Sequence, residues 1–356
     1  MEDKRITIKE IAKIAKVSPS TVSMVINNKP GVAPDTRSRV HRIVDAFNFT
    51  PNPVARSLVK SRSNAVAMLV TTIQNVIYPI IVAGVESVLW DMGYTLSIFS
   101  TNEDEALEAK EIETIKARGF DGVINAACLL DNQNSERLAN SGIPTVWVLR
   151  RYPKIRNLDH VIVDDKKATY LAVEHVIRMG HKRIGIIKGP GYTSTGTERY
   201  EGAVTALRDY GIALSDDLIQ QGDYLRESGY QATKAFLGLK TRERPTAICA
   251  ANDQMATGAF DALLDAGLKI PEDIALTGAN NVEASSFRSM EITTVKGNRR
   301  EMGRLGAKRL IEKIEKKRGH KKPFQIVLDP ELIIRRSCGF NRASGYRIKK
   351  AEKRTI

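Results

Sequence analysis

The sequence predicts an α/β protein in which a small headpiece, built as a helix-turn-helix, precedes a body of two doubly wound lobes. Three observations support this fold class. Near the N-terminus, two short amphipathic segments are separated by a tight turn and followed by a third. From Ala65 onward, short apolar runs alternate with amphipathic helical segments, which is typical of parallel βαβ units. The length of 356 residues exceeds that of one typical domain.

Three helices are expected in the headpiece, residues 1–50. Thr7 and Glu10 fit a capping box at the start of the first helix. Ser18 suits the N-cap of the second helix and Pro19 its first turn, while the third helix starts at about Ala33. The side chains expected to form the core are Ile8, Ile11, Ala12, Ala15, Val22, Val25, Ile26, Val40, Ile43, Val44 and Phe47. This pattern favours a DNA-binding helix-turn-helix, and a three-helix module that binds another partner is the alternative.

The body, residues 65–341, contains eight apolar runs that predict strands. They lie at 65–70, 95–100, 122–127, 145–150, 161–164, 183–188, 246–251 and 274–278. Helical patterns lie between them, among others at 103–117, 167–179, 198–209 and 254–266. Because eight strands are too many for one small parallel sheet, we expect two sheets, one in each lobe.

Charge and composition limit the functional classes. The net charge of +14 is concentrated at the two ends of the chain, with twelve basic and five acidic residues in 1–62 alone. A basic head on a nearly neutral body is typical of a nucleic-acid-binding protein. The basic tail, 342–356, is predicted to be disordered and to aid solubility, with a DNA contact as the alternative.

The sequence also argues against several other classes of protein. No run of about 18 apolar residues predicts a membrane span, and the charged N-terminus lacks the apolar core of a signal peptide. Cys128, Cys249 and Cys338 lie far apart and match no metal-ligand spacing, which favours a reducing cytoplasm and no metal or cofactor. The five histidines match no catalytic or metal motif, so we expect no enzyme.

Several motifs in order resemble the LacI/GalR family of bacterial transcription regulators. The headpiece carries ITIKEIAKIAKVSPSTVSMVIN, followed by TRSRVHRIVDAFNFTPNPVARSL. The body carries DGVI, GHKRIGII, RYEGAVTAL, PTAICAANDQMATGA and IPEDIALTG. The resemblance covers nearly the whole chain except the tail and implies a body like that of periplasmic binding proteins. One lobe would then hold about 65–162 and 292–324, and the other about 163–291 and 325–341.

The resemblance also assigns DNA contacts in the headpiece. Phosphate contacts fall to Thr7, Ser18, Thr21, Ser23 and Asn27, and base-edge contacts in the major groove to Pro19, Ser20 and Met24. Family members usually carry arginine, the common reader of guanine, at the position of Met24. Methionine cannot make that contact, so we expect Met24 to make an apolar contact, for example with a thymine methyl group. The alternative is that Met24 packs beneath a neighbouring helix.

A hinge helix is implied within residues 51–64. In the family this helix orders in the minor groove, where its leucine wedges a base step open. The matching positions are Asn52 as the cap, Leu58 as the wedge, and Val54 and Ala55 beside it.

Effector contacts are implied in the cleft between the lobes, where strands end. The matched positions are Thr72, Asn75, Arg199, Tyr224, Asn252 and Asn280. Three carboxylates that are common in the family are absent, because Thr72, Leu149 and Asn280 stand in their places. An anionic or less hydroxylated ligand is therefore favoured over a plain sugar, and a protein corepressor or no effector remain as alternatives. Arg199 also suits a structural ion pair, and Asp253 suits a helix cap.

These features predict a homodimeric, sequence-specific repressor that binds pseudopalindromic double-stranded operator DNA in the bacterial cytoplasm, associated with the nucleoid. A small molecule is expected to modulate it by changing the angle between the lobes. The alternative is a solute-binding receptor without a DNA role, which the basic headpiece argues against.

Overall fold

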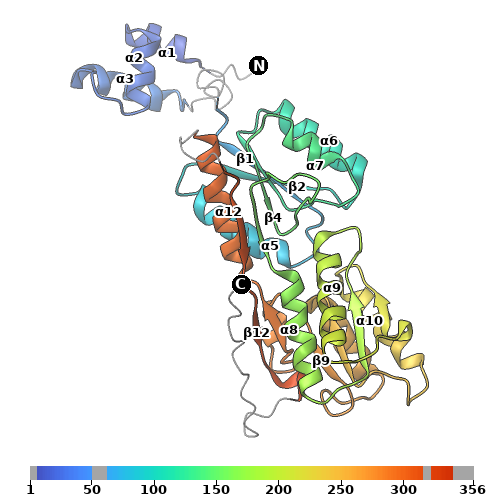
Figure 1. The fold of residues 1–356 in the computed structure, drawn as a ribbon. Coiled ribbons are helices and arrows are strands. Elements are labelled where there is room, and N and C mark those ends of the chain that lie inside the picture. The colour runs from blue at the N-terminus through green and yellow to red at the C-terminus, as the bar shows by residue number, and fades with distance from the viewer. Residues whose placement is uncertain (1–5, 50–61, 316–321, 340–356) are drawn as a thin grey trace. The chain divides into compact units, whose positions relative to one another are not determined.

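The protein is described here by a computed structural model, which covers residues 6–49, 62–315 and 322–339. These residues form two compact units that divide between Ser63 and Asn64. The predicted hinge contacts Asn52, Val54, Ala55 and Leu58, and the basic tail 342–356, lie outside the described residues. Figure 1 shows the helical headpiece and the α/β body, each as a unit of its own.

The described part of the headpiece contains three helices, as predicted. They are α1 (Ile8–Ala15), α2 (Pro19–Ile26) and α3 (Pro34–Ala46). The fully buried core side chains are Ile11, Ala12, Ala15, Val22, Val25 and Val40, and Ile8, Ile26, Ile43 and Val44 pack partly buried against them. The prediction for Phe47 is wrong, because its side chain is 53% exposed. The helix ends at Ala46, a left-handed Asn48 (φ +45°) turns the chain back, and Phe49 packs on the core instead.

The first lobe is built on a six-stranded parallel sheet in the order β11-β5-β4-β3-β1-β2. Its strands are β1 (Ala65–Val70), β2 (Thr95–Ser100), β3 (Gly122–Asn125), β4 (Thr145–Val148), β5 (His160–Val163) and β11 (Gln325–Leu328). One apolar cluster joins the sheet to α5 (Ile77–Leu89) and α12 (Arg299–Ile314). A second cluster contains side chains of α6 (Glu105–Ala117) and α7 (Asn134–Ala139). Helices therefore cover both faces of the sheet, as predicted.

The second lobe has a four-stranded parallel sheet in the order β7-β6-β8-β9. Its strands are β6 (Ile184–Lys188), β7 (Ile219–Gln221), β8 (Ala247–Ala250) and β9 (Ala275–Thr277). On one face pack α8 (Asp165–Arg178) and α9 (Ser194–Asp209), and on the other α10 (Arg226–Gly238) and α11 (Asp253–Asp265). Short 3₁₀ helices occur at Asp216–Leu218, Glu283–Ser286 and Arg336–Cys338.

The lobe boundaries differ from those inferred from the resemblance. Residues 325–341 were assigned to the second lobe, but β11 pairs with β5 in the first. Residues 292–296 were assigned to the first lobe, yet Thr293 bridges to Thr277, and β10 (Thr294–Lys296) pairs antiparallel with β12 (Glu331–Ile333). Both errors arise at strands of three or four residues, which are too short for the alternation of apolar residues to show the sheet to which they belong.

Close packing of helices on the sheets depends on a few glycines. A Cβ at Gly303 of α12 would lie 2.2 Å from the backbone oxygen of Ile81 in α5, and one at Gly84 would meet the backbone of Arg300. The pair α10 and α11 has the same arrangement at Gly229 and Gly258. Among the described residues, no helix is both long and apolar enough to cross a membrane.

We therefore expect Gly303→Ala to destabilise the body, because the new methyl group meets backbone that cannot rotate away. Overpacking of this kind lowers the free energy of unfolding by about 1–3 kcal/mol. The matched control is Gly238→Ala at the end of α10, where a Cβ meets nothing within 4 Å. That change should be neutral or slightly stabilising. Denaturant unfolding of both variants measures the difference, and equal stabilities would refute the close-packing argument.

Candidate functional site

The headpiece helices begin at the capping residues that the sequence predicts. The Thr7 amide donates to Glu10 Oε2 (2.7 Å) and the Glu10 amide donates to Thr7 Oγ1 (3.3 Å), which completes the capping box. Ser18 Oγ accepts from the Thr21 amide (3.1 Å), and Pro19 occupies the first turn of α2. These contacts fix the start of α2 through side chains that stay exposed.

The outer edge of α2 carries the predicted DNA contacts. Ser18, Pro19, Ser20 and Asn27 are exposed, and Thr21, Ser23 and Met24 are partly exposed. Met24 does not belong to the apolar cluster formed by Ile11, Val22, Val25 and their neighbours. The alternative that Met24 packs beneath a neighbouring helix therefore loses its support, and its side chain lies on the same accessible edge as Ser20. The Ser20 hydroxyl is 2.6 Å from Ser18 Oγ, and either atom can donate.

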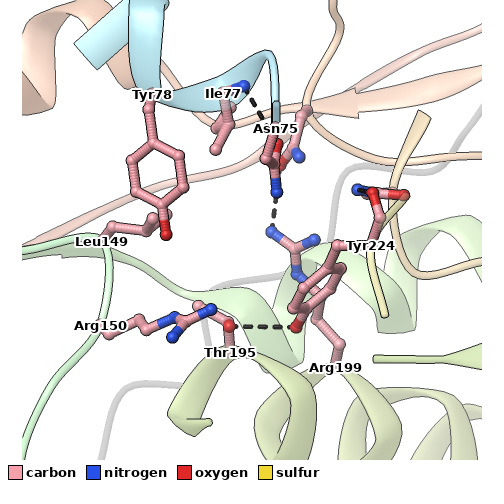
Figure 2. Close-up of a pocket in the computed structure, with 10 residues that line it drawn as sticks. Asn75, Ile77, Tyr78, Leu149, Arg150, Thr195, Arg199 and Tyr224 are labelled. Carbon is pink, nitrogen blue, oxygen red and sulfur yellow. Dashed lines mark hydrogen bonds between the residues drawn. The ribbon is translucent and has the colours of Figure 1, made fainter. Parts of the chain in front are cut away.

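A small cavity in the body brings together five of the six predicted effector contacts. It is lined by Asn75, Ile77, Tyr78, Leu149, Arg150, Thr195, Arg199, Tyr224, Asn252 and Asn280. The cavity has a volume of about 20 Å³, which is room for about one water molecule. Figure 2 shows Tyr78 and Asn75 on one side of it and Arg199 and Tyr224 on the other. The sixth predicted residue, Thr72, does not line it, and its hydroxyl accepts from the Gln74 amide (3.2 Å).

Arg199 is buried at one end of a charged cluster. Its Nε and Nη2 donate to Asp165 Oδ1 at 2.9 and 2.7 Å, its Nη2 also donates to Asn280 Oδ1 at 3.0 Å, and its Nη1 donates to the Ala251 carbonyl. Arg299 Nη2 donates to the same two acceptors, at 3.2 and 3.3 Å. Arg199 thus forms the structural ion pair expected as its alternative role, and it lines the cavity as well.

Asn252, and not Asp253, caps α11. Asn252 Oδ1 accepts from the Met255 amide (2.9 Å), and its Nδ2 donates to the Tyr224 carbonyl (2.8 Å). The expectation that Asp253 caps this helix is therefore wrong, because Asp253 already lies in the first turn. Its carboxylate instead accepts from the Val282 amide and the Thr294 hydroxyl, and joins α11 to β10.

Three residues that line the cavity have a strained backbone. Leu149, Tyr224 and Asn280 have φ angles of +70°, +72° and +105°, in the region that favours glycine. Each such residue costs about 1–3 kcal/mol and persists only where the surroundings hold it. Tyr224 is held by its hydroxyl, which pairs with Thr195 Oγ1 (3.0 Å), and by Asn252 at its carbonyl. Strain of this kind is a frequent feature of ligand sites.

Comparison with known proteins covers both units. A family model described as bacterial regulatory proteins, lacI family, matches residues 7–52, and one described as periplasmic binding proteins and sugar binding domain of LacI family matches residues 63–335. The chain belongs to the LacI family of bacterial regulators. It is 34% identical over 334 residues to the HTH-type transcriptional repressor PurR of Haemophilus influenzae (strain PittEE), covering 93% of this chain and 98% of the relative. The PurR repressor of Pasteurella multocida (strain Pm70) is 32% identical over 332 residues, with the same coverage.

Solved structures of LacI-family proteins share the fold. The lac repressor dimer bound to operator and the anti-inducer ONPF aligns with a TM-score of 0.83 and 27% identity, covering 94% of this chain and 99% of that one. A complex of the transcriptional regulator CelR with cellobiose aligns with a TM-score of 0.71 and 27% identity, covering 94% and 100%. The predictions of fold class and family are thereby confirmed.

Sequence reasoning missed three polar residues of the cavity in this LacI-family chain: Tyr78, Arg150 and Thr195. Arg150 is the second residue after the carboxyl end of β4, and that position in an open parallel sheet is a signal for a ligand contact. Tyr78 and Thr195 lie in the first turns of α5 and α9, where the sequence alone does not show that their side chains turn toward the cavity.

Asp253 predicts a pH dependence of stability. Burial raises the pKa of Asp253 to about 7, against the lowering effect of the hydrogen bonds from Thr294 and Val282. The carboxyl group therefore contributes stability that is full below its ordinary pKa of 3.8 and is lost as the pH rises to about 7. Since one pKa unit corresponds to about 1.4 kcal/mol, the loss amounts to a few kcal/mol.

Asp253→Asn should remove this part of the pH dependence. Unfolding free energies measured from pH 4 to pH 8 should fall less steeply for the variant than for the wild type between pH 4 and 7. Above pH 7 the two curves should run parallel. Parallel curves over the whole range would show that Asp253 titrates near its ordinary pKa.

Proposed function

We propose that this DNA-binding repressor of the LacI family reads its operator with the exposed edge of α2 and is regulated by a small molecule bound in the body's cavity. The observation that carries the proposal is the headpiece itself. Its apolar cluster holds α1, α2 and α3 together, while the polar edge of α2 stays accessible. Side chains cap the starts of α1 and α2. A recognition helix needs this separation between a buried face and a free face.

The proposed DNA contacts divide into two groups. The capping hydroxyls and Asn27 suit phosphates, which position the helix without reading sequence. Ser20 and Met24 suit base edges, where Ser20 is the hydrogen-bonding reader and Met24 an apolar one. As a regulator of this kind the protein is not an enzyme, and we place it in the cytoplasm, where its DNA lies.

Homodimerisation is supported by an exposed apolar surface on the first lobe. Trp90 is 84% exposed, and Met92 and Ile98 are 43% and 46% exposed. Ile98 lies on β2, an edge strand of the six-stranded sheet. An open groove of about 740 Å³, lined in part by Trp90, Tyr94 and Leu96, lies along β2. Exposed apolar surface along a sheet edge is typical of an interface between protein chains. The related lac repressor is described as a dimer on its operator.

The selection of bound duplexes from a random DNA pool tests the DNA-binding proposal. Full-length protein at moderate salt should enrich a two-fold symmetric consensus, because each protomer of a symmetric dimer reads one half-site. No enrichment would leave a headpiece that binds DNA by charge alone, and would favour a solute receptor.

Met24→Arg tests the assignment of the base-reading residue. The variant should shift the preferred base toward guanine at one position of each half-site, by about tenfold or more, because a bidentate arginine–guanine contact is worth about 1–3 kcal/mol. The control is Ile14→Arg, which adds the same charge on α1, where Ile14 is 50% exposed. That variant should bind all duplexes more tightly with an unchanged consensus. If the wild type and both variants select the same consensus, Met24 does not contact bases.

Trp90→Glu tests the proposed dimer surface. Sedimentation should show weaker dimers, with a dissociation constant raised at least tenfold, because a charge would then be buried in the interface. Val327→Glu is the matched control, since Val327 is 55% exposed on β11 at the opposite edge of the same sheet. Equal dimerisation by the two variants would exclude the surface around Trp90.

A further inference from the structure

The charged residues that line the cavity are both arginines. Of the ten described lining residues, Arg150 and Arg199 are charged, and none is a carboxylate. Arg199 is neutralised by Asp165, which it shares with Arg299. Arg150 is paired with Glu103, with 3.0 Å between Arg150 Nη2 and Glu103 Oε1. Within the described part of the chain, these three arginines thus share two carboxylates, which leaves one positive charge uncompensated by direct partners.

Arg150 holds free hydrogen-bond donors inside the protein. Its side chain is only 3% exposed, yet its Nε and Nη1 atoms have no hydrogen-bond partner among the residues that the structure describes. Figure 2 shows the guanidinium group of Arg150 reaching toward the cavity beside Thr195. Buried donors without acceptors are rare in native proteins because they lose their hydrogen bonds to water and gain none in return. The free donors of Arg150 therefore need an acceptor, and a ligand bound in the cavity can supply it.

Neighbouring groups keep Arg150 charged. Burial lowers its pKa, but Tyr78, Glu103 and Tyr224 more than offset this and raise the pKa above the ordinary value for arginine. Asp253, an acid near Arg199, accepts hydrogen bonds from Thr294 and Val282 and is incompletely ionised at neutral pH. Its contribution to the local charge is accordingly reduced.

We infer that the regulatory ligand is a small carboxylic acid whose carboxylate binds the free donors of Arg150. The inference rests on the proposed regulatory role of this cavity and specifies the chemical class of its ligand. A carboxylate carries the single negative charge that the cluster lacks, whereas a phosphate dianion carries an excess. Its two oxygens accept hydrogen bonds from a guanidinium group in a fixed plane. The tyrosines Tyr78 and Tyr224 supply flat apolar faces for the rest of the molecule.

Arg150 also links the ligand to contacts between the lobes. Glu103 Oε1 accepts from Arg150, and Glu103 Oε2 accepts from the Tyr192 hydroxyl of the second lobe at 2.6 Å. The Leu130 amide donates to the Tyr192 carbonyl at 2.9 Å. The cavity of about 20 Å³ is smaller than any organic acid, so a ligand enters when the lobes move apart. The guanidinium group of Arg150 then binds the ligand and also Glu103, which contacts Tyr192 of the second lobe. Ligand binding at the cavity is thereby connected to the contact between the lobes.

Calorimetry on the full-length protein tests the inference. The probes are acetate, pyruvate, succinate and benzoate, each with a neutral counterpart: acetamide, pyruvamide, succinamide and benzamide. Glucose, adenine and inorganic phosphate complete the set. At least one acid should bind and raise the melting temperature, and its amide should bind at least tenfold more weakly. The inference is overturned if none of the four acids binds, or if each acid binds no more tightly than its amide. Equal or tighter binding of phosphate overturns the assignment to a carboxylate.

Two variants locate the binding group. Arg150→Gln should raise the dissociation constant of the acid at least tenfold, and Arg150→Lys should give an intermediate value. Because Arg150→Gln leaves the partly exposed Glu103 without its ion-pair partner, the double variant Glu103→Gln/Arg150→Gln provides a version without an unpaired charge. The matched control is Arg151→Gln, the adjacent arginine, whose side chain is 48% exposed and pairs with Glu198. An unchanged acid affinity in the Arg150 variants, with folding verified by circular dichroism, overturns the inference.

Failure of this inference is distinguishable from failure of the proposed function. Duplex selection measures operator binding directly and calorimetry measures ligand binding without DNA. A wild-type protein that binds a symmetric operator but no acid refutes only the ligand class. A protein that binds acid and selects no duplex refutes the regulatory role and leaves the ligand class intact.

Discussion

The body depends on one buried carboxylate. Asp165 Oδ1 accepts hydrogen bonds from Arg199 and Arg299, and so joins the starts of α8 and α12 to α9. Asp165 follows the first passage of the chain from one sheet to the other, and Arg299 follows the second. Removing one member of a buried ion pair costs about 3–5 kcal/mol, because the remaining charge stays in a medium of low polarity. This cluster therefore fixes where the two lobes join and forms one wall of the cavity.

The strained backbone around the cavity follows from the same arrangement. Asn280 accepts from both arginines and is held at φ +105°, and Tyr224 is held at φ +72° by Asn252 and Thr195. These contacts turn amide and hydroxyl groups toward one small space, and among the described residues that line it Arg150 keeps unused donors. Side chains fixed by such contacts lose little further conformational freedom when the lobes move apart and a ligand binds.

The sequence predicted the architecture better than the details of the site. All eight predicted strands occur, because buried parallel strands are uninterrupted apolar runs such as 65–70, and helix starts such as Thr7 and Ser18 are set by local hydrogen bonds. Strands of three or four residues carry no comparable pattern, and β11 was assigned to the wrong lobe. Arg150 was missed because its lack of partners depends on groups from distant segments. Phe47 shows the same limit, since one left-handed residue after the helix changed which aromatic ring is buried.

The base-reading residue proposed for the headpiece lies outside the contacts that stabilise its fold. The fold of the headpiece depends on its apolar cluster and two capped helix starts, none of which requires a particular side chain at Met24. In the body, by contrast, the two roles overlap, because Arg199 pairs with Asp165 and also lines the cavity, and Arg150 is held by Glu103. A position outside the stabilising contacts can change its chemistry without loss of the fold, because surface substitutions away from such contacts alter stability little. The departure from the family pattern at Met24 therefore bears on which bases the protein reads and leaves its fold unchanged.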